Sequence, residues 1–360
     1  MSCSQKQGRS PFPSGNPFRK MLPKGSDLPS RHLALLKEFE EKLADKLRKL
    51  MPKGEDDILS LPWMKLSLQL LSQTHDDMNS LITELKLPVC DRDDTWVCLY
   101  LDNSANLLDL CNAFISELSR LSQGQLLLQF GLHNLDPTGS INLVKARTSF
   151  HSWMQHIGSS NPRVENCSSI ILELVKLLVL PKPLNSSKAR VLMHALYGVQ
   201  VQTLFVFGVF TAAFTGSPQT LIDLPVPKAN LWAEAFVDLQ TSVNQEIREL
   251  VSSERNFILK ELEAVDSIVK GLCPMLDGAA EGDEALRKSA TELQKRAERL
   301  SEGLDLLSRE VDGFFRIVLS GRDCLLSELR KGIVLSCTMQ ESKAEPKMVK
   351  AIKWMRTSFL

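Results

Sequence analysis

The chain has 360 residues, 43% hydrophobic and 24% charged, and its 43 basic side chains are balanced by 43 acidic ones. This neutrality excludes a general nucleic-acid binder held by a net positive field, although local charged patches are still allowed. Leucine, a strong helix former, is abundant, and tyrosine occurs only twice. This bias favours helices over sheets, which are rich in aromatic and β-branched residues. The composition therefore predicts an all-α protein.

Residues 1–30 differ from the rest of the chain, because they carry five basic side chains and no acidic one before Asp27. A basic, acid-poor N-terminus resembles an organellar transit peptide. The Pro and Gly content is equally typical of a disordered basic arm. We see no secretory signal core, and the eight cysteines are scattered without metal-binding spacing. We therefore expect an intracellular protein with reduced thiols.

Apolar residues at helical spacing predict five helices in the first half of the chain. Pro and Gly residues separate these segments, and such breaks let consecutive helices pack as antiparallel neighbours. We expect them to belong to one bundle over residues 31–335. The five expected helices are 31–51, 61–87, a third that follows the acidic turn 91–94 and ends near 135, 141–157 and 164–180.

The run 191–222 is apolar and contains no Asp, Glu, Lys or Arg. A helix needs about 20 apolar residues to span a bilayer, and this run reaches that length only by including Gln200 and Gln202. An all-round apolar helix contacts lipid or lies buried in a bundle, and the glutamines favour burial if they find hydrogen-bond partners. As membrane or partner contacts we single out Phe205, Phe207, Phe210 and Phe214.

Residues 228–335 predict a long C-terminal helical hairpin. Its first arm has apolar residues from Trp232 to Leu272, and its second arm alternates steps of four and three between Leu286 and Val318. That alternation is typical of a coiled-coil seam. We favour pairing within the chain over a homodimer, so the expected fold is an elongated antiparallel helical bundle.

The tail 336–360 predicts a basic amphipathic helix, with Met348, Val349, Ile352 and Met355 on one face. Such a helix suits an anionic membrane surface or a partner with a helix-binding groove. The alternative is a terminal helix that packs its tryptophan onto the bundle. The candidate contact residues are Lys347, Lys350, Lys353, Trp354 and Arg356.

No catalytic, cofactor or metal site follows from the sequence. His151 and His156 lie five residues apart without a neighbouring Glu in a zinc-binding motif, and His75 stands beside Asp76 on a predicted helix, where adjacent side chains diverge. We find no phosphate-binding loop and no nucleophile elbow. We therefore expect neither enzymatic activity nor a cofactor.

Several ordered segments resemble the plant BYPASS family. They are 15–19 (GNPFR), 63–66 (WMKL), 74–75 (TH), 81–85 (LITEL), 87–88 (LP), 116–121 (SELSRL), 123–124 (QG) and 132–135 (LHNL). The resemblance covers nearly the whole chain, and its specificity lies in the ordered set.

This resemblance implies a non-enzymatic regulator of plant root and shoot development, in a family thought to restrain a mobile root-derived signal that arrests shoot growth. It defines no catalytic or binding residues. We expect action through an unknown protein partner or a membrane surface, on endomembranes or their cytosolic face, with the chloroplast as the alternative location. The alternative function is an enzyme or accessory subunit that acts on a small apolar precursor beneath 191–222.

Overall fold

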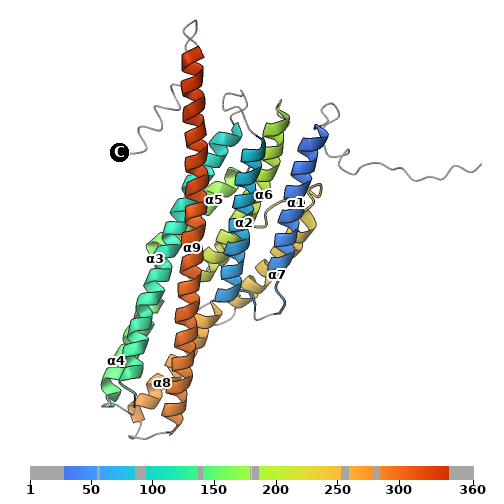
Figure 1. The fold of residues 1–360 in the computed structure, drawn as a ribbon. Helices are drawn as coiled ribbons and strands as arrows, with labels where there is room; N and C mark the ends of the chain where they lie inside the picture. The colour runs from blue at the N-terminus through green and yellow to red at the C-terminus, as the bar shows by residue number, and fades with distance from the viewer. Residues whose placement is uncertain are drawn as a thin grey trace, which may run out of the picture.

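The computed structural model describes residues 28–54, 57–85, 95–136, 141–178, 180, 186–252, 259–278 and 284–339. All regular elements in these ranges are helical, so the all-α prediction is confirmed (Figure 1). The elements are α1 Ser30–Leu50, α2 Leu61–Leu85, α3 Thr95–His133, α4 Leu143–Gly158, α5 Pro162–Lys176, α6 Ser187–Thr215, η2 Pro218–Thr220, α7 Ala233–Ser252, α8 Lys260–Gly278 and α9 Glu284–Met339.

Helix α6 is the centre of the molecule, and it contacts α1, α2, α3, α5, α7 and η2. It begins at Ser186, whose hydroxyl caps the helix by accepting from the Ala189 backbone N–H, and it ends at Gly216 in the left-handed conformation. The apolar run is therefore a core helix in this structure. One expectation fails, because the buried amide of Gln202 has no hydrogen-bond partner in the part of the chain described.

Helices α3 and α9 form the long axis of the molecule, with α4 and α8 beside their lower halves in Figure 1. Helix α9 also lies along α2. A Cβ added at Gly303 would meet Leu61, and one added at Gly321 would meet Asn79. The residue numbers of the contacting pairs increase in the same direction along both helices, so α2 and α9 run parallel. We expected antiparallel neighbours throughout, and this expectation was wrong for α2 and α9. A total of 198 residues lie between Leu85 and Glu284, so no short connection forces these two helices to be antiparallel.

The C-terminal segments differ from the expected hairpin. Helix α8 lies along α9, whereas α7 lies on α1 and contacts α6. Ring contacts join the start of α7 to α6, since Phe236 meets Phe205 of α6 at a centroid distance of 5.7 Å and Trp232 meets Tyr197 of α6 at 6.1 Å. The seam of α9 is buried between α2, α3 and α8 of the same chain, which accounts for its periodicity without a second chain.

One hydrophobic cluster extends from Leu28 to Leu325 and includes buried side chains from all the α-helices. Helix α3 continues through Gly124 to His133. A Cβ at Gly124 would lie 2.8 Å from the Ile157 side chain, so this glycine lets α4 approach α3 closely. Residues 1–27 of the expected arm 1–30 and residues 340–360 of the expected tail 336–360 lie outside the described residues.

Candidate functional site: a cleft between α3, α4, α5, α6 and α8

A cleft of about 430 Å³ lies where the corner between α4 and α5 meets α3, the end of α6 and the start of α8. Polar and apolar side chains both line it. The lining residues are Glu117, Arg120, Leu121, Met154, Ile157, Gly158, Ser159, Ser160, Asn161, Val164, Glu165, Ala213, Phe214, Thr215, Gly216, Leu259, Leu262, Asp266 and Lys270.

Local sequence shapes the corner between α4 and α5. Asn161 is the N-cap of α5, and its side-chain oxygen accepts from the Arg163 backbone N–H at 3.1 Å. Pro162 follows at the first helical position, where its fixed φ suits a helix start and no N–H is lost. The chain therefore leaves α4 at Gly158 and re-enters a helix within four residues, which places both helix ends at the cleft.

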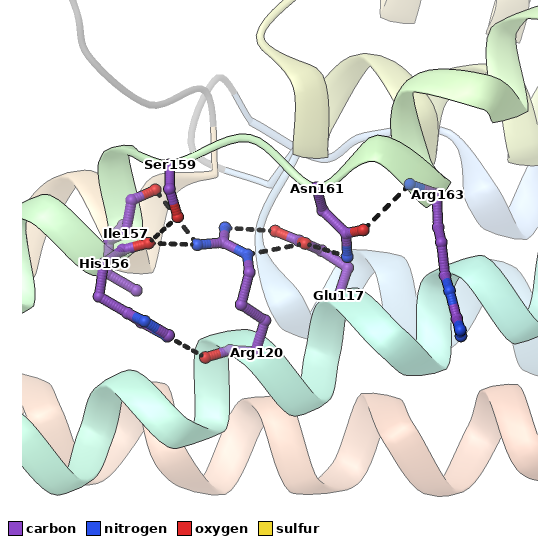
Figure 2. A network of polar contacts seen from close by, with 7 residues as sticks. All are labelled: Glu117, Arg120, His156, Ile157, Ser159, Asn161 and Arg163. Carbon is purple, nitrogen blue, oxygen red and sulfur yellow. Dashed lines mark hydrogen bonds and ion pairs between the residues drawn. The ribbon is translucent and has the colours of Figure 1, made fainter.

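Glu117 and Arg120 form the floor of the cleft (Figure 2). They lie three residues apart on one face of α3, and the guanidinium donates to both carboxylate oxygens, at 3.0 Å from Nε and 2.6 Å from the terminal nitrogen. The Glu117 side chain is 3% exposed and that of Arg120 17%. A buried carboxylate is stable only when it is paired and hydrogen-bonded, and this two-point contact supplies both.

The rest of this network ties α3 to the corner. Arg120 also donates to the His156 carbonyl at 2.5 Å, at the C-terminal end of α4. The His156 ring makes a second hydrogen bond between these two residues, in which its Nε2 donates to the Arg120 carbonyl at 2.8 Å. Asn161 Nδ2 donates to Glu117 at 2.9 Å. Figure 2 shows the Arg163 side chain pointing away from this network.

The opposite wall of the cleft comes from α8. The buried Asp266 carboxylate accepts from Lys270 Nζ at 2.6 Å, and the lysine side chain is 45% exposed. Leu259 and Leu262 add apolar surface below this pair. Both cationic side chains of the cleft, Arg120 and Lys270, are therefore already paired with carboxylates.

A second, much smaller cavity lies beside α6, with a volume of about 30 Å³. His75 lines it, and burial together with the nearby Lys46 charge lowers the pKa of this histidine to about 3. The Thr203 hydroxyl donates to the Val199 carbonyl, so His75 Nε2 donates to the hydroxyl oxygen at 3.2 Å. The volume is about that of one water molecule, which leaves no room for a metabolite.

The predicted contact residues occupy three different environments. Phe205, Phe207 and Phe210 are buried in the core, where Phe207 stacks on Phe114 at a centroid distance of 5.2 Å. Phe214 is partly exposed and lines the cleft. The tail candidates Lys347, Lys350, Lys353, Trp354 and Arg356 lie outside the described residues, so these contacts stay predictions.

Sequence reasoning missed Glu117, Arg120 and Asn161. The available signal was an acidic and a basic residue three apart within an otherwise apolar helical pattern, inside the segment 116–121 that carries part of the family resemblance. Within the described ranges, no group of three His, Cys, Asp or Glu side chains is placed to hold a metal ion. His151 is exposed.

Helix α6 is long and apolar enough to cross a membrane by length and composition, with a mean hydropathy of 1.4. However, 94% of that window is buried inside the protein. The core helix of a soluble protein passes the same test, so this is weak evidence for insertion.

The fold and the cleft define an all-helical protein with a preformed pocket whose floor is held by ion pairs. The chain belongs to the ROH1-like family, because it matches the family described as "Protein ROH1-like" over residues 24–154 and 150–329.

Among curated proteins, "Protein BPS1, chloroplastic" of Arabidopsis thaliana is 50% identical over 330 residues, which are 92% of this chain and 93% of the relative. "UPF0496 protein 4" of Oryza sativa, in subspecies indica and japonica, is 44% identical over 276 residues, which span 76% of this chain and 60% of the rice proteins. These relatives confirm the BYPASS-type resemblance and its class of plant developmental regulators. No solved structure matches the chain.

Proposed function

We propose that this protein is a non-enzymatic regulator of plant root and shoot development that acts by binding. The observation that carries the proposal is its 50% identity to Protein BPS1 along 92% of the chain. The cleft supports a binding role, because its charged groups are held in place by each other and a preorganised pocket loses little entropy when it is filled.

A growth experiment tests the regulatory role. A plant line that lacks this protein is complemented with the wild-type chain or with an empty vector, and root and shoot growth are measured. We expect altered growth in the line and restoration by the wild-type chain only. Normal growth of the line without the protein, with its relatives also removed, would contradict a developmental role.

The alternative function is an enzyme or accessory subunit that acts on a small apolar precursor of a mobile signal. The small cavity beside α6 is too small to hold such a compound, whereas the cleft of about 430 Å³ is large enough. Incubating purified protein with root extract and profiling the metabolites distinguishes the two functions. Conversion of a compound that also accumulates in tissue lacking the protein would overturn the binding role.

For location, we propose peripheral attachment to an endomembrane or its cytosolic face through the tail residues Lys347, Lys350, Lys353, Trp354 and Arg356. Their pattern in the sequence supports this proposal. The chloroplast is the alternative, supported by the basic N-terminus and by the name of the Arabidopsis relative. A fluorescent fusion at the C-terminus, imaged in root cells, distinguishes the two.

A further inference from the structure

We propose that the cleft binds a small organic cation with an apolar body, such as a primary amine carried on a ring. This inference rests on the binding function proposed above and names the class of ligand. The volume of about 430 Å³ falls within the range of about 300–1,000 Å³ that is usual for small-molecule sites. Met154 and Phe214, which both line the cleft and are partly exposed, provide the apolar contact surface.

The side-chain charges of the cleft favour a cation. Three carboxylates line it, from Glu117, Glu165 and Asp266, and two cations, from Arg120 and Lys270, so the formal charge is 2 − 3 = −1. Arg120 is paired with Glu117 and Lys270 with Asp266. The Glu165 side chain is exposed, and in the described part of the protein it makes no ion pair or side-chain hydrogen bond. It is therefore the group that an incoming ammonium would meet.

The helix ends add to this preference. Helix α6 ends at the cleft, and a helix C-terminus carries partial negative charge. Helix α4 also ends there, but its last carbonyls already accept from Arg120 and Ser159. Helix α5 begins there, but Asn161 occupies its first amides, with the side-chain oxygen accepting from Arg163 and the backbone carbonyl accepting from Val164 and Glu165. An anion would find no unoccupied backbone donor in this first turn, so the cleft discriminates against it.

The test uses the full chain and three probes of one shape, 3-phenylpropylamine, 3-phenylpropanol and 3-phenylpropanoate, titrated by calorimetry. We expect the amine to bind at least roughly tenfold more tightly than the carboxylate, with the alcohol between them, because only the amine gains from the negative lining. Glu165→Gln should remove most of that difference while leaving the binding of the alcohol unchanged.

A cleft-filling variant identifies the site. A Cβ at Gly158 meets no atom within 4 Å and this glycine has no positive φ, so Gly158→Trp extends a ring into the cleft without disturbing the core. Gly313→Trp in α9 is the matched control, because its Cβ also meets open space and it does not line the cleft. Circular dichroism confirms that both variants are folded. We expect the amine to bind the control and not Gly158→Trp.

Three results would overturn the proposal: equal or tighter binding of the carboxylate, binding of the amine to Gly158→Trp, or no binding of any probe to the wild-type chain. These outcomes are separate from the growth experiment. If the chain binds no amine but restores growth, the proposed ligand class is wrong and the proposed developmental role stands. If the chain binds the amine but does not restore growth, the proposed ligand class stands and the proposed developmental role is wrong.

Discussion

At the scale of single residues, the molecule holds several polar groups inside an apolar bundle, and the contacts of each decide its effect on stability. Arg120 and Glu117 are fully engaged with each other and with the corner between α4 and α5. Gln202 is buried without a partner, and His75 is buried and neutral. These three cases lead to effects of different sign.

Arg120→Met should reduce the free energy of unfolding by about 3–5 kcal/mol, because it leaves the buried Glu117 carboxylate uncompensated. Urea denaturation followed by circular dichroism measures the loss. The double variant Glu117→Met with Arg120→Met should lose less than the sum of the single variants. Arg163→Met, whose side chain points away from the network, should change stability by less than about 0.5 kcal/mol. Additive single losses would contradict the pairing.

Gln202→Met should stabilise the protein by about 1–3 kcal/mol, since it removes a buried amide whose nitrogen and oxygen both lack a partner. The same substitution at Gln200, which is only partly buried, should have a small effect. The thermal midpoints of the three proteins provide the comparison. A lower midpoint for Gln202→Met would mean that the amide has a partner in solution.

His75 should make the protein less stable as the pH falls below about 6.5. Its pKa is about 3 when folded and 6.5 when unfolded, so between these values the unfolded chain binds a proton that the folded chain does not. The contribution of neutral His75 to the free energy of unfolding is fully present above pH 6.5, and it decreases by up to about 1.4 kcal/mol per pH unit below that value. His75→Leu should show a smaller drop in urea midpoint between pH 7 and pH 4.5 than the wild type. Parallel curves would argue against a buried neutral imidazole.

At the scale of the elements, the sequence predicted most helices to within a few residues, because Pro and Gly breaks and apolar periodicity are local signals. Which helices pack on one another is not encoded in nearby sequence, and the sequence did not predict it. The periodicity of α7 is the same whether it packs on α1 or on α9. Its position depends on contacts with distant residues, such as Phe236 with Phe205 of α6 and the Leu231 backbone N–H with Glu40 of α1. The cleft was missed for the same reason, since Glu117, Asn161 and Asp266 lie on three helices and no spacing connects them.

Gly208 decides how closely η2 packs on α6. A Cβ there would lie 2.8 Å from the Thr220 carbonyl oxygen, a backbone atom that cannot turn aside. Gly208→Ala should therefore cost about 1–3 kcal/mol of stability by forcing a backbone shift. Gly271→Ala in α8 is the control, because its Cβ meets open space and alanine is the better helix former by up to about 1 kcal/mol. The two urea midpoints should move in opposite directions, and a shift of both in the same direction would contradict the close contact.

At the scale of the whole molecule, burial of α6 changes which experiment can locate a membrane anchor. Phe207 is 0% exposed, so Phe207→Asp would place an unpaired charge in the core and unfold the protein. Loss of membrane binding by that variant would report unfolding. Substitutions in the predicted tail avoid this problem because they change no side chain of the described core.

We expect membrane association to be peripheral and sensitive to salt. Membranes carrying the tagged protein are washed with about 1 M salt, at which the screening length falls to roughly 3 Å, and then with alkaline carbonate. The protein should be released by salt, and replacing Lys347, Lys350 and Lys353 by Gln should prevent binding in the first place. Retention through both washes would require insertion into the hydrocarbon, and would contradict attachment through the tail.

The parallel pair of α2 and α9 has a consequence for the order in which the protein is made. Helix α9 is the last of the described helices to leave the ribosome, yet it supplies Phe314, which meets both Phe207 and His75 in the centre of the core. Until it emerges, the apolar side chains of α2, α3 and α6 that pack against α9 lack that partner. Completion of the core therefore waits until α9 has been synthesised, and chains terminated before α9 should depend on chaperones.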